Sequence, residues 1–130
     1  MRTRIFKVRA FDRWAAEEGL SDDVLTFAGK EALNGLTDAR LGANVFKKRI
    51  SQPGRGKSGG WRTIIVFKAS GRLFYVYGFA KKERANIGLA ELKALRRLAK
   101  ELMQYSEEQL AVALKHGELV EVTGNEKLDS

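Results

Sequence analysis

Two runs of residues decide the fold: WRTIIVF at positions 61–67 and LFYVYGF at positions 73–79. Both are rich in β-branched and aromatic residues, which is typical of β-strands. The segment between them, which includes ASGR at 69–72, is short enough for a tight hairpin. A third apolar run at 45–50 precedes the pair and alternates loosely, as a strand does. The sequence therefore predicts an antiparallel, meandering sheet.

Helical patterns flank these strands on both sides. Apolar residues recur at helical spacing in 11–18 and 24–33, and glycines at 19 and 35 end the two segments. Ser21 is a suitable N-cap for the second helix. Leucines at 89, 92, 95, 98 and 102 mark a third helix, and Ser106 with Gln109 forms the capping box of a fourth. Residues 5–9 and 119–122 are predicted short strands, whereas 36–42 and 51–60 are predicted to be a connection and a loop.

The predicted fold class is α+β. We expect a small antiparallel sheet of three to five strands, with two N-terminal helices packed on it and further helices at the C-terminus. A length of 130 residues fits one domain. Residues 1–104 are expected to form its main body, and residues 105–130 an acidic helical extension of the same domain.

Composition excludes several classes of protein. Because 44% of the residues are apolar and spread along the chain, disorder is excluded for most of it. The lack of cysteine excludes disulfides, cysteine-based metal sites and thiol catalysis. No apolar run is long enough for a transmembrane helix, and the N-terminus lacks the apolar stretch of a signal peptide. We therefore expect a cytoplasmic protein that uses no cofactor and no metal.

Charge is distributed unevenly along the chain, whose net charge is +8. Residues 40–84 include 12 basic residues and one acid, Glu83, whereas residues 101–130 include two basic residues and seven acids. A basic middle followed by an acidic tail favours a surface that binds a polyanion. Nucleic acid is the first candidate and anionic lipid the second. The alternative is a solvated basic surface that keeps the protein soluble.

Strand parity predicts that the basic side chains converge. The residues expected to share one face are Lys47 and Arg49 on the first strand, Arg62 on the second, and Tyr77, Phe79 and Lys81 on the third. Lys48 is expected to point inward or to lie at an edge. A sheet that carries several cations and aromatic rings suits single-stranded RNA, because the charges bind phosphates and the rings stack on bases. The alternative for any one of these residues is an ordinary solvated position on a strand.

The glycine-rich loop resembles two nucleotide-binding motifs but lacks their context. GRGKSG at 54–59 matches G-x-G-x-x-G, yet a strand follows it where a dinucleotide-binding motif needs a helix. GKS at 56–58 ends like a P-loop, but Ser51 occupies the position of its first glycine. A flexible lid, an amide-rich phosphate contact or a plain hairpin loop remain as interpretations. Histidine-based catalysis is not expected either, because the one histidine, His116, lies in the acidic tail.

Four segments carry a family resemblance: LG at 41–42, KKRI at 47–50, GRGKSGGWRT at 54–63 and YGFAKKERANI at 77–87. They resemble the RelE/HigB-like toxins of bacterial type II toxin–antitoxin systems, within the RelE/ParE superfamily. The resemblance spans roughly residues 4–104. It is strongest to the branch whose loop reads G-x-G-K-S-G-G before an aromatic–Arg pair. It implies a small antiparallel sheet flanked by two N-terminal helices.

The resemblance also implies an activity and a partner. The activity is cleavage of mRNA in the decoding site of the ribosome, which inhibits translation. The partner is an antitoxin encoded next to the toxin, here expected to be of the helix-turn-helix type. By position, Lys47 and Arg49 match the paired strand basics of the family, and Arg62 matches its arginine after the Gly–aromatic pair. Lys82, with Lys81 beside it, matches a further basic residue, and Ile87 falls near the place of a late tyrosine or histidine.

RNA cleavage by the neighbouring 2′-OH needs a base, a charge that stabilises the transition state and an acid for the leaving oxygen. Crowded cations disfavour further charge, which lowers the pKa of a lysine among them. We expect Lys47 to be the base and Arg62 to hold the scissile phosphate, with Arg49 and Lys81 or Lys82 on the leaving side. The predicted cleavage is metal-independent and forms a 2′,3′-cyclic phosphate. Further RNA contacts are expected from Lys48, Arg55, Lys57, Trp61, Tyr77, Phe79 and Arg84.

Two alternative functions suit the same fold. One is a non-catalytic nucleic-acid-binding protein, and the other is a gyrase inhibitor similar to the ParE toxins. The basic set favours RNA cleavage over gyrase inhibition, because cations directed at phosphates have no necessary role in gripping a protein. An acidic or amphipathic antitoxin segment suits the basic face in every case, with mRNA and the ribosome as further partners and no membrane. The C-terminal extension is expected to pack back across the sheet edge or to contribute to the antitoxin interface.

Overall fold

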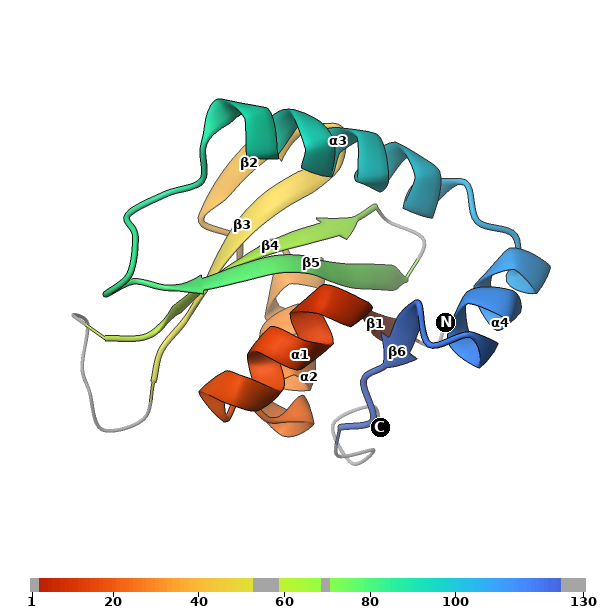
Figure 1. Cartoon of the computed structure of the whole chain (residues 1–130), viewed down its shortest axis with the longest axis horizontal. Coiled ribbons are helices and arrows are strands. Elements are labelled where there is room, and N and C mark those ends of the chain that lie inside the picture. Colours follow the sequence, from red (N-terminus) through yellow and green to blue (C-terminus); the bar gives the residue numbers. More distant parts are fainter. Residues whose placement is uncertain (1–2, 53–58, 69–70, 125–130) are drawn as a thin grey trace.

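The computed structural model describes residues 3–52, 59–68 and 71–124. Its centre is a six-stranded sheet with the order β2-β3-β4-β5-β1-β6 (Figure 1). Strands β2 to β5 form an antiparallel meander, β1 pairs with β5 in parallel, and β6 pairs with β1 antiparallel. The strands are β1 Arg4–Val8, β2 Ala39–Gly42, β3 Val45–Ile50, β4 Trp61–Phe67, β5 Arg72–Ala80 and β6 Leu119–Glu121.

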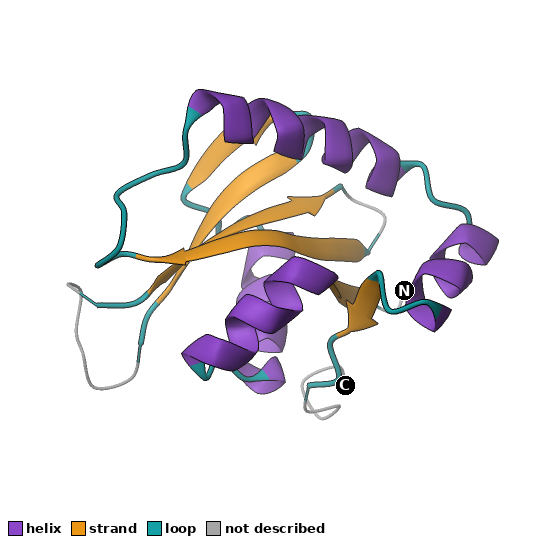
Figure 2. Ribbon diagram, viewed as in Figure 1, coloured by secondary structure: helices purple, strands orange, loops and turns teal. Residues whose placement is uncertain are grey.

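Helices cover both faces of this sheet (Figure 2). The helices are α1 Arg9–Glu18, α2 Asp22–Leu33, α3 Leu89–Met103 and α4 Glu107–Lys115. Helices α1 and α2 pack on one face, where Ile65 and Tyr75 are buried. Helices α3 and α4 pack on the other face, where Ile64 and Phe74 are buried. Burial on both faces explains why the sequence of β4 is almost continuously apolar.

Most predicted elements are confirmed. Strands β3 and β4 have the predicted bounds, and Ser21 caps α2 by accepting the Val24 N–H at 3.3 Å. The prediction that 36–42 is only a connection was wrong, because β2 lies within it and pairs with β3 at the edge of the sheet. A four-residue edge strand has too little alternation to be recognised in the sequence, and its pairing is set by the tertiary structure. The described residues therefore form six strands rather than three to five.

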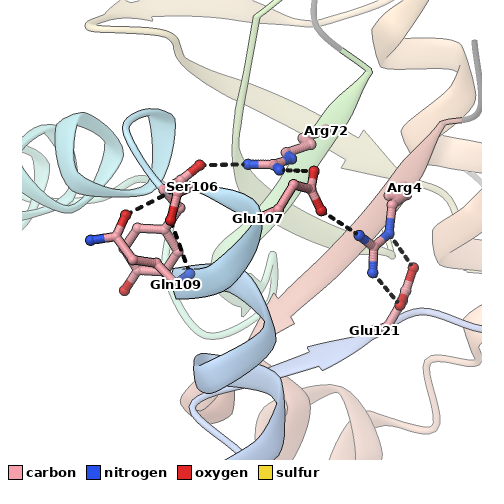
Figure 3. Close-up of polar contacts among 7 residues, drawn as sticks. Arg4, Arg72, Ser106, Glu107, Gln109 and Glu121 are labelled. Carbon is pink, nitrogen blue, oxygen red and sulfur yellow. Dashed lines mark hydrogen bonds and ion pairs between the residues drawn. The ribbon is translucent and has the colours of Figure 1, made fainter.

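The C-terminal segment packs back across the sheet edge, as one version of the sequence hypothesis predicted. Strand β6 pairs with β1, and Ser106 caps the N-terminus of α4 through the predicted capping box with Gln109 (Figure 3). Ion pairs hold this segment to the sheet: Arg4 binds Glu121 with two hydrogen bonds of 3.0 and 2.9 Å. Arg72 donates to the Tyr105 carbonyl at 2.8 Å and also binds Glu107.

Two negative findings concern the described residues. None of their helices combines the length and the apolar character that crossing a bilayer requires. Across the same parts of the chain, no group of three His, Cys, Asp or Glu side chains is placed to hold a metal ion.

Candidate nucleic-acid interface

The predicted basic residues of β3 and β4 meet on the face of the sheet that carries α3. Val45 and Ile64 belong to the core beneath α3, and strand alternation puts Lys47, Arg49 and Arg62 on the same face. The pairing register aligns Lys47 with Ile64, and Arg49 with Arg62. Arg49 is exposed, whereas Lys47 and Arg62 are half-buried. Three cations from two neighbouring strands therefore share one surface, which we call the cationic face.

Aromatic residues of β5 continue this surface. Tyr77 and Phe79 are the register partners of Ile64 and Arg62, so Arg49, Arg62 and Phe79 form one row across three strands. The two rings lie 6.1 Å apart between centroids. Tyr77 is half-buried, but Phe79 is only 3% exposed, so its ring is largely covered by its neighbours. The row thus runs from exposed charge to a buried aromatic ring.

The cationic face is electrostatically unsatisfied. Within the described residues, no carboxylate forms a salt bridge with Lys47, Arg49 or Arg62. Burial lowers the pKa of Arg62, and the positive charge of Arg49 lowers it further. Asp38 opposes this effect only in part, and its carboxylate accepts the Arg49 backbone N–H at 2.7 Å. An anion bound between these side chains would relieve the repulsion between them.

Lys48 does not belong to the cationic face. It alternates to the opposite face of β3, where it is 7% exposed. Its Nζ donates to the Leu36 carbonyl at 2.8 Å and lies 3.2 Å from the Glu31 carboxylate. The expected contact between Lys48 and RNA is therefore corrected, because the side chain is buried and its charge is already paired. The inward direction expected from strand parity is confirmed.

Trp61 is also turned away from the cationic face. Its side chain belongs to the core under α1 and α2 and is 5% exposed. The indole Nε1 donates to the Glu18 carboxylate at 2.9 Å. The expected contact between Trp61 and RNA is corrected, since its ring is buried and its indole N–H is already bound to Glu18. Its neighbour Gly60 has a φ of 113°, and a side chain there would meet the Ile50 carbonyl at 2.7 Å.

Arg84 is near the predicted site but is not free to bind phosphate. Its guanidinium donates to the Tyr77 hydroxyl at 2.9 Å and to the two Glu91 carboxylate oxygens at 3.1 and 2.6 Å. The guanidinium carbon lies 5.9 Å from the Tyr77 ring centre and 5.5 Å from that of Phe79. Its hydrogen bond lowers the pKa of Glu91 to about 2. Arg84 thus pairs with Glu91 and lies over the rings of Tyr77 and Phe79 in cation–π contact.

The remaining predicted residues divide into two groups. Lys81 and Lys82 are exposed in the turn that follows β5, and the Lys81 N–H donates to the Gly60 carbonyl at 3.2 Å. This bond keeps the turn beside the start of β4. Strand β5 ends at Ala80, so strand parity does not extend to Lys81. Arg55 and Lys57 lie outside the described residues, as does most of the glycine-rich loop.

Sequence reasoning missed two acidic residues that shape the site. Asp38 precedes β2, and Glu91 lies three residues after Gly88, the N-cap of α3. The Glu91 carboxylate also accepts the Gly88 backbone N–H at 2.8 Å. That spacing is a capping signal, which was available in the sequence. Its pairing with Arg84 was not, because it depends on how the turn after β5 folds against α3.

Comparison with known proteins identifies the family. None of the curated proteins that were compared with the chain matches it significantly. The family described as the RelE toxin of the RelE/RelB toxin–antitoxin system matches residues 3–122. The match runs through α4 and β6 and includes every residue of the cationic face. The α+β architecture agrees with it, and the chain therefore belongs to the RelE toxin family.

Proposed function

We propose that this protein is an endoribonuclease that cleaves mRNA on the ribosome and is restrained by an antitoxin. Membership of the RelE toxin family supports a toxin of a toxin–antitoxin system in general terms. The single observation that carries the specific proposal is the cationic face, where Arg49 and Arg62 are register partners and, among the described residues, no carboxylate forms a salt bridge with either of them. Such a pair favours a bound anion, and a ribose–phosphate chain supplies anions in series.

The proposed reaction is a transesterification within one phosphodiester, helped by proton transfer at each end. The Nζ of Lys47 takes the proton of the 2′-OH, and the 2′ oxygen attacks the neighbouring phosphorus. Arg62 stabilises the negative charge that develops on the phosphoryl oxygens. The bond from phosphorus to the 5′ oxygen breaks, and that oxygen takes a proton from the ammonium group of Lys81 or Lys82, with Arg49 beside it. The products are a 2′,3′-cyclic phosphate and a 5′-OH.

We propose that the ribosome, rather than the toxin, holds the mRNA in the geometry needed for cleavage. The cationic face offers charge but few groups that would orient a flexible RNA strand. Holding reactants in a reactive geometry contributes a large part of many rate enhancements. An mRNA that is already fixed in the decoding site would need mainly the charges of Lys47, Arg49 and Arg62. Three finer points remain predictions from the sequence. They are the assignment to the branch with the G-x-G-K-S-G-G loop, the likeness to HigB and an antitoxin of the helix-turn-helix type.

Growth arrest combined with mapping of mRNA ends tests the proposal. Induced expression of the wild-type protein should stop growth and produce new 5′ ends within translated messages. Lys47→Ala should abolish both effects, whereas Lys115→Ala should retain them. Lys115 is a matched control, because the same charge is lost on α4, at the end of the molecule opposite the tips of β3 and β4 (Figure 1). Arrest with DNA breaks and intact messages would instead support gyrase inhibition, and no arrest would support a non-catalytic binder.

A further inference from the structure

Asp38 is an exposed residue that lies at the edge of the cationic face, directly before β2. Hydrogen bonds of a strand alternate between its two neighbours, so the Lys47 carbonyl and the Arg49 N–H both face β2. The Lys47 carbonyl accepts the Asp38 N–H at 2.9 Å. The ladder between β2 and β3 ends at the pair of Ala39 and Lys47, two residues short of Arg49. The Asp38 carboxylate accepts the Arg49 N–H at 2.7 Å and thereby replaces the missing strand partner.

Lys48, the residue between these two contacts, is held from other directions. Its Nζ lies 3.2 Å from the Glu31 carboxylate on the opposite face of the sheet. Its backbone carbonyl accepts the hydroxyl of the buried Thr63, on β4, at 2.8 Å. The three residues at 47–49 are therefore fixed from β4, from beneath the sheet and from Asp38. Of these contacts, the one from Asp38 is exposed, so it can be removed without disturbing the core.

The charge of Asp38 acts on the arginines of the cationic face. Burial and the positive charge of Arg49 both lower the pKa of Arg62, whereas the negative charge of Asp38 raises it. A negative charge beside two positive ones reduces the repulsion between them, so both guanidinium groups can stay side by side before an anion arrives. The same negative charge repels a phosphate, so it should weaken the binding of RNA. The hydrogen bond and the charge of Asp38 therefore have different consequences for the site.

We propose that Asp38 is a positioning residue of the cationic face, which holds the backbone of Arg49 and so presents this arginine beside Arg62 to one phosphodiester. The inference rests on the proposed RNA cleavage and deepens it, because it names the group that orients one of the phosphate-binding cations. Charges that are already in place need no rearrangement when the transition state forms. Asp38 thus supports cleavage through its hydrogen bond to Arg49, while its charge opposes the binding of RNA.

Two substitutions of Asp38 separate the hydrogen bond from the charge. Asp38→Asn keeps an oxygen that can accept the Arg49 N–H but loses the negative charge, whereas Asp38→Ala loses both. Single-turnover cleavage of ribosome-bound mRNA at saturation should be about tenfold slower in Asp38→Ala than in Asp38→Asn, since small displacements of a catalytic group are costly. The rate of Asp38→Asn should stay within about twofold of the wild type, because Arg49 keeps its place.

Binding of a labelled hexamer of 2′-O-methyl uridine measures the positioning without cleavage, because this RNA lacks the attacking hydroxyl. Asp38→Asn should bind the hexamer about twofold more tightly than the wild type, because a repulsive charge is lost. Asp38→Ala should bind it about fivefold more weakly than Asp38→Asn, which corresponds to one hydrogen bond. Amide exchange of the Arg49 N–H, followed by NMR, should be about fivefold faster in Asp38→Ala and unchanged in Asp38→Asn. Glu108→Gln, which loses an exposed acid on α4, should match the wild type throughout.

The same two substitutions in an Arg49→Ala background show whether Asp38 acts through Arg49. In that background, the differences between Asp38→Ala and Asp38→Asn in rate and in affinity should vanish. Differences that persist without the Arg49 side chain would overturn the inference. An equal loss of rate in both variants would also overturn it, because the charge of Asp38 would then be the group that the reaction uses.

The outcomes separate this inference from the proposed function. Normal cleavage by the wild type, with equal rates and affinities in Asp38→Asn and Asp38→Ala, would overturn the inference alone. A lower urea midpoint in Asp38→Ala without these differences would show that the contact only stabilises β3. A wild type that binds the hexamer but leaves ribosome-bound mRNA intact would overturn the proposed cleavage, and the hexamer affinities would still test the placement of Arg49. A wild type that neither binds nor cleaves would overturn both.

Discussion

The two ends of the sheet use arginine in opposite ways. At one end, Arg4 and Arg72 are neutralised by Glu107 and Glu121 of the acidic C-terminal segment (Figure 3). At the other end, the cationic face has no such partner among the described residues. Glu107 and Glu121 of this segment therefore stabilise the fold, and they lie away from the cationic face. The difference separates cations that hold the fold together from cations that are available to a ligand.

The largest effect is expected from substituting one arginine at each end. Arg62→Ala should lower the rate of cleavage of ribosome-bound mRNA by about 100-fold, as the loss of one transition-state charge contact commonly does. Its free energy of unfolding should change by less than about 0.5 kcal/mol, because no salt bridge is lost. Arg72→Ala should show the reverse, with a stability loss of about 1–2 kcal/mol from its two lost contacts and normal cleavage by the folded protein.

Urea denaturation and single-turnover cleavage measure the two quantities on the same preparations. A large loss of stability in Arg62→Ala would show that this arginine supports the fold. A large loss of activity in Arg72→Ala, at a concentration of urea where it is fully folded, would remove the distinction between the two ends.

The salt dependence of RNA binding should distinguish the same two arginines. Each phosphate contact to a single strand contributes about −0.7 to the slope of log affinity against log salt. With Lys47, Arg49 and Arg62 bound to phosphates, the slope should be about −2, which is a roughly 20-fold loss between 50 and 200 mM salt. Arg62→Ala should reduce the magnitude of the slope by about 0.7, and Arg72→Ala should leave it unchanged. Fluorescence anisotropy of a labelled hexamer of 2′-O-methyl uridine measures the slope for each variant. Identical slopes in Arg62→Ala and Arg72→Ala would contradict the assignment of Arg62 to a phosphate contact.

A comparison within β3 applies the same distinction to adjacent lysines. Lys48 is buried against Glu31 and the Leu36 carbonyl, whereas Lys47 lies on the cationic face. Lys48→Ala should cost about 1–2 kcal/mol, less than for a fully buried pair because the Glu31 side chain is 37% exposed. Lys47→Ala should cost less than about 0.5 kcal/mol. Midpoints of urea unfolding measure both, and a greater loss in Lys47→Ala would reverse the proposed roles.

The fold was predictable from the sequence wherever local signals agree with the tertiary structure. The apolar runs of β3 and β4 and the capping residues Ser21 and Ser106 each specify their elements locally. Strand β2 was missed because its four residues carry no such signal. The shared face of Lys47, Arg49 and Arg62 follows from alternation alone, once the strands are known to be neighbours.

The parts of the candidate site that could not be predicted depend on burial and on contacts distant in sequence. Trp61 has the residue type of a stacking platform, but its partner Glu18 lies 43 residues away. Arg84 has the residue type of a phosphate ligand, but the turn after β5 directs it to Glu91 and to two rings.

The smallest expected effect concerns Arg84, which is paired like Arg4 although it lies at the open end of the sheet. The hydrogen bond from Arg84 lowers the pKa of Glu91 from 4.5 to about 2. Ionisation of the Glu91 carboxyl therefore stabilises the folded protein relative to the unfolded chain. This contribution is complete above about pH 4.5 and is lost as the pH falls toward about 2, where the folded protein also takes up the proton. The difference between the urea midpoints at pH 5 and pH 2.5 should therefore be smaller in Glu91→Gln than in the wild type. Glu108→Gln, which loses an acid with no salt bridge among the described residues, should keep the wild-type difference. An unchanged difference in Glu91→Gln would show that Arg84 is held by its rings and by the Asn86 carbonyl rather than by charge.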